Sequence, residues 1–208
     1  GTGTTINFRI PSGNLDQLNM LGGGDLIAAS WATAGTDIPA HLFNINSAMI
    51  QLTGYALKHA FCKSDVWQHV LNNTKVAAQG GTSNVVFETI AQDTDGNFTA
   101  VLRSIPWLQW HIVEHGLEVG TSGTYTDLIE DQHIAFTPDP SPEWCEYLEG
   151  SEIVVEGPGV GAAKGEQFGF YPYAYPMHDP AGWNLAAVHN GMPALYVPAA
   201  VAYADVVF

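Results

Sequence analysis

Hydrophobic residues recur every three or four positions between Thr36 and Phe61, and no other segment has comparable helical periodicity. The first line of apolar residues lies on one stripe of an α-helix and contains Ile38, Leu42, Ile45, Met49, Leu52, Ala56 and Ala60. A second line lies beside it, so more than one helix face is expected to be covered: Phe43, Ile50, Leu57 and Phe61. We predict a spine helix over residues 36–61, roughly 39 Å long at about 1.5 Å per residue.

The ends of this predicted helix follow from local chemistry. Thr36 or Asp37 can accept the first free backbone N–H groups as N-cap, and Pro39 is tolerated in the opening turn. Gly54 is the weak point, because glycine costs about 1 kcal/mol relative to alanine inside a helix.

Two further helices are predicted. The segment 65–73 (DVWQHVLNN) forms a shorter helix with Val66, Trp67, Val70 and Leu71 facing inward. Ser141, with Pro142 and Glu143, starts a helix of one or two turns that ends at Gly150. Residues 83–91 are ambiguous between helix and strand, and Gly22–Gly24 mark a hinge or tight loop.

Period-two alternation and β-forming residues predict strands elsewhere in the chain. The predicted strands are 2–10, ending before Pro11, then 98–102, 107–115, 132–136 and 152–156. The Asp95-Gly96 pair is a hairpin signal, and residues 157–165 are a glycine-rich loop. The last forty or so residues are predicted to form aromatic-rich strands. Their prolines (172, 176, 180, 193 and 198) confine these strands to edges or short pieces.

Charge excludes one class of function. The 208 residues include 21 Asp and Glu but only 6 Lys and Arg, giving a net charge of −15, and the basic residues are scattered. A surface of this kind repels a phosphate backbone, so sequence-specific nucleic-acid binding is not expected. No apolar run approaches the length of a membrane span and no signal peptide opens the chain, so no membrane partner is expected. Cys62 and Cys145 are expected to be unpaired thiols, which fits a reducing cytosol.

One motif matches a catalytic pattern. His111, Glu114 and His115 form H-x-x-E-H, the inverted zinc-protease signature, which requires both histidines on one helical face. The flanking alternation instead favours a strand, where the two histidines would lie about 13 Å apart at roughly 3.3 Å per residue. We therefore interpret them as polar residues on the exposed face of a strand. A zinc-dependent hydrolase using His111, Glu114 and His115 remains an alternative.

Other chemical signatures are missing from the sequence. There is no G-x-S-x-G nucleophile elbow, and neither glycine-rich segment matches a phosphate-binding loop. The aromatic segment Phe168–Tyr175 could stack on sugars or bases, but core packing or a subunit interface is favoured. We predict no catalytic residue, no cofactor-binding residue, no metal ligand and no cofactor, so the chain is not expected to be an enzyme. A monomeric carbohydrate-binding β-rich domain is a second alternative.

Several stretches together resemble one family, the major capsid proteins of tailed bacteriophages of the lambda-like capsid protein E group. They are residues 7–31, 36–61, 67–76, 105–116, 133–151, 169–185 and 192–207, the strongest lying in the second half of the chain. Their order and spacing are similar along nearly the whole chain, although no single motif is diagnostic. The resemblance implies an α+β Hong Kong 97-type fold with a long spine helix, extended β-strands and a mixed axial-domain sheet flanked by helices.

The family also implies a division of the chain. Residues 1–35 would be the end of an extended loop and the entry to a peripheral domain, and residues 36–72 would hold its spine and following helix. Residues 73–164 would form the axial domain, residues 165–195 the return strands of the peripheral domain, and residues 196–208 a C-terminal axial strand. The N-terminal arm of the family is not found.

The implied function is structural. The chain would self-assemble through pentamers and hexamers into an icosahedral head that encloses phage double-stranded DNA. It would be a component of the virion, assembled in the host bacterial cytoplasm, with scaffolding, decoration and portal proteins as further partners. The expected contact regions are the spine face, the Gly22–Gly24 hinge and the terminal strands. The low charged fraction, 13%, fits large contact surfaces, since unpaired charge in an interface is costly.

Overall fold

The computed structural model describes residues 7–92, 97–114, 116–118, 125–149, 151–153, 166–168, 170–178, 181–189 and 191–208. The chain divides into two compact units. Unit 1 comprises Gly1–Asp139 and Val197–Phe208, and unit 2 comprises Pro140–Tyr196.

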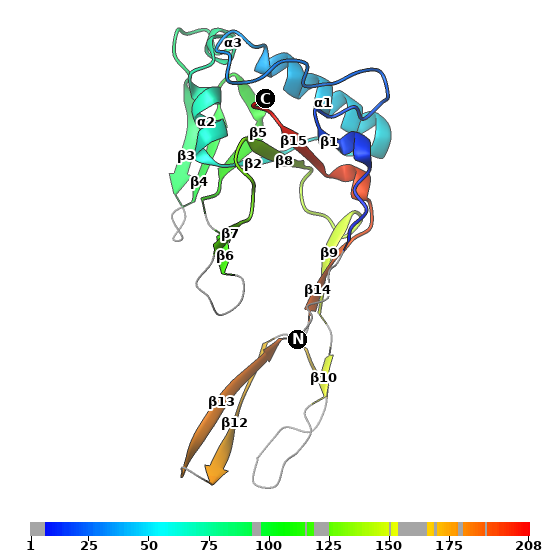
Figure 1. The fold of residues 1–208 in the computed structure, drawn as a ribbon, viewed down its shortest axis with the longest axis vertical. Helices are drawn as coiled ribbons and strands as arrows, with labels where there is room; N and C mark the ends of the chain where they lie inside the picture. Colours follow the sequence, from blue (N-terminus) through cyan, green and yellow to red (C-terminus); the bar gives the residue numbers. More distant parts are fainter. Residues whose placement is uncertain are drawn as a thin grey trace. The chain divides into compact units, whose positions relative to one another are not determined.

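Unit 1 is built on a seven-stranded mixed sheet with the order β1-β15-β8-β2-β5-β4-β3. The strands are β1 (Leu15–Asp16), β2 (His59–Cys62), β3 (Phe87–Gln92), β4 (Phe98–Leu102), β5 (Ile105–Ile112), β8 (His133–Thr137) and β15 (Ala202–Asp205). The pairs β1–β15 and β2–β5 are parallel and the other neighbours are antiparallel. A separate small ribbon pairs β6 (Gly116–Glu118) with β7 (Tyr125–Asp127). Figure 1 shows the helices gathered on one side of the sheet.

The principal helix, α1, runs from Ile38 to Thr53 and is shorter than the predicted spine helix. Its N-terminus is as predicted, since the Asp37 side chain accepts from the Ala40 N–H at 3.1 Å. Its C-terminus is not. Gly54 adopts φ 80° and its N–H donates to the Ile50 carbonyl, so this glycine ends the helix. The prediction that the helix continues to residue 61 was wrong.

The two shorter helices are α2 (Ser64–Leu71) and α3 (Thr74–Gln79). The first confirms the predicted second helix, with Val66, Trp67 and Val70 buried. The second was not predicted. Its N-cap is Asn73, whose side-chain oxygen accepts from the Lys75 and Val76 N–H groups.

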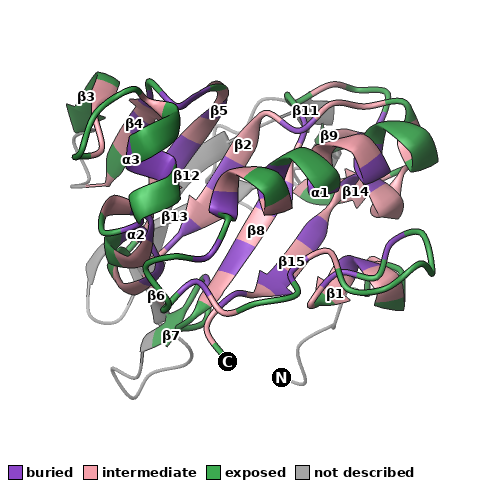
Figure 2. Cartoon of the chain, turned by 90° about the horizontal axis from the view of Figure 1, so that it is seen from above, coloured by how far each residue is buried: buried purple, intermediate pink, exposed green. Residues whose placement is uncertain are grey.

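Alternation along the strands places the core between the sheet and the helices, as the bands of burial in Figure 2 show. Trp110 of β5 is fully buried, and its ring lies 5.4 Å from that of Trp67 on α2. The sheet also contributes these residues to the core: Ile105, Leu108 and Ile112 of β5, and from other strands Ala60, Cys62, Leu102, Ile134, Phe136, Ala202 and Ala204. Residues at the intervening positions, such as His59, Phe61 and His111, lie on the opposite face of the sheet.

Most of the predicted strands of unit 1 are confirmed. β4 has the predicted bounds, β5 and β8 differ from prediction by a few residues, and the ambiguous segment 83–91 contains the strand β3. The predicted N-terminal strand is wrong where it can be compared, because residues 7–10 are irregular. They are followed by a 3-10 turn, η1 (Ser12–Asn14). Residues 2–6, the Asp95-Gly96 turn and the loop 157–165 lie outside the described residues.

Unit 2 consists of two-stranded antiparallel ribbons. They pair β9 (Cys145–Glu149) with β14 (Gly191–Leu195), β10 (Ser151–Ile153) with β11 (Glu166–Phe168), and β12 (Phe170–His178) with β13 (Ala181–His189). Together with η2 (Pro198–Ala200) and β15 of unit 1, these strands confirm the β-rich C-terminal segment. Pro172, Pro176 and Pro193 stand in strands that have one partner each, as their missing N–H groups require.

The short helix predicted from Ser141 to Gly150 is wrong. Ser141 does start a turn, because its carbonyl accepts from the Trp144 and Cys145 N–H groups, but the chain then extends into β9. The five residues of β9 pair with Gly191–Leu195, more than forty positions further on. This distant partner satisfies the backbone groups that a helix would have paired locally.

Candidate functional site

The residues of the H-x-x-E-H motif that the structure describes are directed to different partners. His111 lies near the end of β5, and its Nε2 is 3.0 Å from Nδ1 of His59. Glu114 follows the strand, and its Oε1 accepts from the Ser64 N–H, at the first turn of α2, at 2.6 Å. His115 lies outside the described residues. His111 and Glu114 do not lie on a helix, so these two residues do not form the geometry of an inverted zinc protease.

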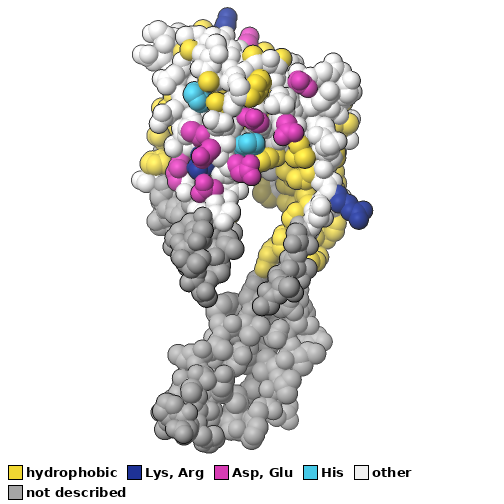
Figure 3. Space-filling view, viewed as in Figure 1, with side chains coloured by type: hydrophobic (Ala, Val, Ile, Leu, Met, Phe, Trp, Pro, Cys, Tyr) yellow, Lys and Arg dark blue, Asp and Glu magenta, His cyan; other side chains and the backbone are white. Residues whose placement is uncertain are grey.

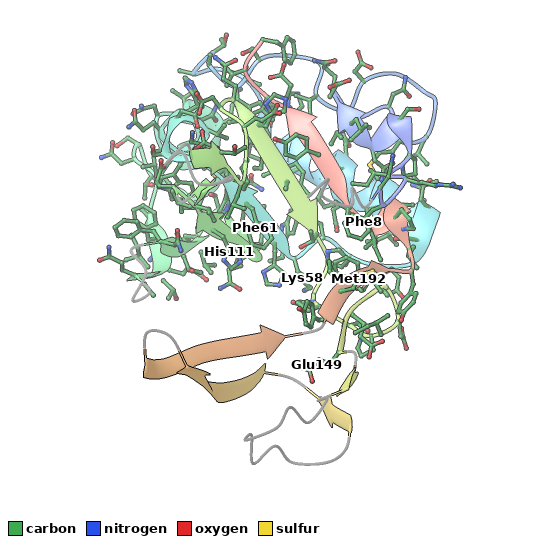
Figure 4. All side chains as sticks on the ribbon, turned by 60° about the horizontal axis from the view of Figure 1, so that its bottom comes forward. Phe8, Lys58, Phe61, His111, Glu149 and Met192 are labelled. Carbon is green, nitrogen blue, oxygen red and sulfur yellow. The ribbon has the colours of Figure 1, made fainter. Side chains whose placement is uncertain are left out.

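His59 was not singled out by the sequence, although it is the central residue of the cluster around His111. Its Nε2 lies 2.9 Å from Oδ1 of Asp139, and its side chain is 16% exposed. β2 and β5 are parallel neighbours with Phe61 opposite His111 and His59 opposite Gln109, so these side chains share one face of the sheet. The Phe61 ring stacks on His111 at 4.5 Å with an interplanar angle of 14°, and Figure 4 shows the two side by side. We call His59, His111 and Asp139 the histidine cluster.

Two histidines have lowered pKa values. Burial lowers the pKa of His111, and the neighbouring His59 lowers it further. Burial also lowers the pKa of His41, which the Asp37 carboxylate partly opposes. Neutral His41 has a defined role, because its Nδ1 accepts a hydrogen bond from the indole N–H of Trp31 at 3.1 Å. Both imidazoles are therefore favoured as neutral groups in the folded chain.

We predict that the free energy of unfolding decreases as the pH falls from 7.5 to 5.5. The unfolded chain binds protons at these histidines near the ordinary pKa of 6.5, whereas the folded chain binds them at lower pH. Stability is thus fully present above pH 6.5 and is lost progressively below it, at up to about 1.4 kcal/mol per pH unit for each proton. Urea unfolding across this range measures the slope. A His41→Asn, His111→Asn double variant should have a clearly flatter slope, and an unchanged slope would contradict this assignment.

Acidic side chains gather near the junction of β2 and α2, on the face of unit 1 seen in Figure 3. Lys63 donates to Asp127 at 2.9 Å and also to Asp131, and these two hydrogen bonds raise its pKa. Asp65 accepts from the Val66 and Gln132 N–H groups, each at 2.7 Å. These contacts fasten the segment 127–132 to the start of α2. In the part of the chain that the structure describes, no three His, Cys, Asp or Glu residues are grouped to hold a metal ion.

Both cysteines are free thiols, as predicted. Cys62 is fully buried in the core of unit 1, and this burial raises the pKa of its thiol. A buried, protonated thiol is a poor nucleophile. Cys62 is therefore a packing residue of the core.

The outer face of α1 exposes large apolar side chains, with Phe43 66% exposed and Ile50 43%. Leu52, in the last turn of the first apolar line, is also 45% exposed, so the prediction that this line is buried fails at that position. Phe43 and Ile50 belong to the second apolar line, so the prediction that this line is covered fails for unit 1 itself. Phe43 also borders an open groove of about 470 Å³ between α1 and α3, which is lined by Asp37, Pro39, Ala40, Asn44, Lys75 and Gln79. A hydrophobic helix face of this kind is typical of a surface that another chain covers.

Apolar side chains are also exposed on the β9–β14 ribbon of unit 2. Tyr147 is 50% exposed, Leu148 39% and Met192 49%. Two-stranded ribbons are marginally stable by themselves in water. The strands described in unit 2 each have one partner, so their outer edges carry backbone groups that a further strand could pair.

The edge strand β3 of unit 1 offers a third surface of the same kind. Most of its residues are exposed, including Ile90 at 57%, and Glu88 is its one charged residue. Edges that avoid pairing normally carry lysine, proline, several charges or a β-bulge. β3 has no lysine or proline and a single charge, and its only such feature is a register shift between Phe87 and Thr89 near its start. The described residues thus present association surfaces more clearly than a catalytic centre.

The mixed sheet, the few helices and the two-stranded ribbons match a phage capsid-like fold. One solved structure with it is described as the "putative capsid protein of prophage (E.coli CFT073)", with a TM-score of 0.57 and 14% identity over 95% of this chain and 54% of that chain. A phage-related protein from Bordetella bronchiseptica RB50 has a TM-score of 0.49 and 12% identity over 86% of this chain and 54% of that chain. This chain thus spans about half the length of each.

Comparison with family models gave no match, and comparison with curated proteins gave none either. None of the helices in the described ranges has the length and apolar content that crossing a membrane requires.

Proposed function

We propose that this chain is a structural, non-enzymatic subunit of a phage capsid that associates with further copies of itself into a closed icosahedral shell around double-stranded DNA. The observation that carries the proposal is the capsid-like fold, which extends over 95% of the chain. In this proposal the family is the lambda-like tailed-phage major capsid proteins of the Hong Kong 97 type.

The surfaces of the chain support this role. A shell subunit must present apolar, weakly charged areas to its neighbours, and the exposed residues of α1, β3 and the β9–β14 ribbon provide them. The net charge of −15 keeps the chain from binding packaged DNA tightly. Scaffolding, decoration and portal proteins are further partners in this proposal, and the virion, assembled in the bacterial cytoplasm, is its location.

The test is assembly of the full-length gene product, followed by sedimentation velocity and electron microscopy. Closed shells of uniform diameter that contain many copies of this chain are expected. A full-length product that stays monomeric under all conditions in which the phage assembles would falsify the proposal.

A substitution on α1 tests which surface assembles. Phe43→Asp is expected to reduce the yield of closed shells at least tenfold while leaving the subunit folded, because Phe43 is 66% exposed in the subunit and a buried carboxylate is costly in an interface. Gln68→Glu adds the same charge at an exposed position of α2 that does not line this groove, and it is the matched control. Circular dichroism checks the fold of both variants. Equal shell yields in Phe43→Asp and wild type would exclude this face of α1 from the contacts.

A further inference from the structure

The histidine cluster has the arrangement of a small metal site. His59 Nδ1 and His111 Nε2 come from adjacent parallel strands, point at one another and lie 3.0 Å apart. We propose that these two nitrogens bind one divalent transition-metal ion, of which Zn²⁺ is the natural probe, with Asp139 orienting His59. The site shares His111 with the H-x-x-E-H motif but combines it with His59 instead of Glu114 and His115.

The separation of the two nitrogens suits a shared ion. Zinc binds imidazole nitrogen at about 2.0–2.1 Å, so two nitrogens of one tetrahedral ion lie roughly 3.4 Å apart. The observed 3.0 Å needs to open by only a few tenths of an ångström. The ring centroids are 5.2 Å apart and the planes are inclined by 46°. Binding one ion requires both rings to turn, so that their lone pairs meet beside the line that now joins the two nitrogens.

Asp139 supplies the orienting contact that metal-binding histidines usually have. It lies 2.9 Å from Nε2 of His59, the nitrogen on the far side of that ring from His111. A carboxylate in this position accepts the Nε2 proton and leaves Nδ1 with a free lone pair. His111 then donates from Nε2 in the metal-free chain. When it binds the ion, its proton resides on Nδ1 instead, so the pair stays neutral and no proton is lost.

The surroundings of His111 suit a transition-metal ion. The ring is half-buried and stacks on Phe61 at 4.5 Å. Imidazole pairs select zinc, copper and nickel over magnesium and calcium, which prefer oxygen. Among the described residues no third protein ligand is added, so water or another molecule would complete the coordination.

Zinc titration of the full 208-residue chain at pH 7.5 tests the proposal. A chromophoric chelator reports the number of ions bound and their affinity. His59→Ala and His111→Ala are each expected to bind one Zn²⁺ per chain fewer than wild type, whereas His69→Ala on α2 should match wild type. The difference between variants is the readout, because histidines outside the described residues could bind zinc of their own.

A further variant makes the test independent of any folding defect. Asp139 is 71% exposed, so Asp139→Ala should fold normally, and it is expected to lower the zinc affinity of this site by about 10–100-fold because it removes the acceptor for His59 Nε2. Wild-type protein that binds no zinc, or His59→Ala and His111→Ala variants that keep every ion, would overturn the proposal. So would an unchanged affinity in Asp139→Ala. Shell assembly is measured separately, so neither result depends on the other.

Discussion

Trp31→Ala is expected to destabilise the chain by about 3–5 kcal/mol, the range for removing a fully buried tryptophan side chain. Trp31 is 0% exposed, and its backbone N–H donates to the Val206 carbonyl at 2.7 Å, so it joins the segment before α1 to the C-terminal segment. Its indole N–H also donates to His41 of α1. For a chain of this size the unfolding temperature should fall by roughly 6–20 °C. Urea unfolding and calorimetry measure both quantities.

Trp31→Phe is the matched variant that separates packing from hydrogen bonding. It keeps an aromatic ring in the core but removes the donor to His41, and it should cost clearly less than the alanine variant. If Trp31→Ala cost under 1 kcal/mol, the buried position of Trp31 would be wrong.

Asn73→Ala is expected to cost about 2–4 kcal/mol, although the residue is polar and outside the apolar core. Asn73 is 1% exposed, and its Oδ1 accepts from the N–H groups of Lys75 and Val76 at the start of α3. Its Nδ2 donates to the Thr36 carbonyl at 2.9 Å, just before α1. Loss of an N-cap costs about 0.5–2 kcal/mol, and a buried group left without its partner adds about 1–3 kcal/mol.

The control is Asn72→Ala, the same substitution one residue earlier. Asn72 is exposed, so its replacement should change the free energy of unfolding by no more than about 0.5 kcal/mol. Equal effects at the two positions would show that Asn73 does not join α3 to the segment before α1.

Local patterns predicted the elements whose stabilising contacts are close in sequence. The line of Ile38, Leu42, Ile45 and Met49 is buried as its spacing requires, and Asp37 caps the helix. The alternation of apolar and polar residues located β4, β5 and β8, because one face of the sheet packs against the core and the other does not. The end of α1 was also present in the sequence. Gly54 signals a helix end, and interpreting it as a tolerated weak point extended the prediction through residues that form β2.

The candidate sites were harder to predict, because their residues come together through the sheet. His59 and His111 are 52 positions apart, and no spacing rule links them. Once residues 59–61 were assigned to a helix, the parallel pairing that places Phe61 opposite His111 could not be foreseen. Interpreting Gly54 as the end of the helix would have left residues 59–62 open to assignment as a strand. That strand would have placed His59 and Phe61 on one face, but it would not have identified His111 as their neighbour.

The sequence by itself determined the acidic, weakly charged character of the chain, the start of α1 and its buried stripe, and the helix or strand type of segments with regular periodicity. Tertiary structure alone decided that Cys145–Glu149 is a strand, that Phe43 remains exposed, and that two histidines meet across β2 and β5. The physical reason is the range of the interactions. Caps and helical stripes depend on residues a few positions apart, whereas strand pairing depends on partners that only the folded chain brings together.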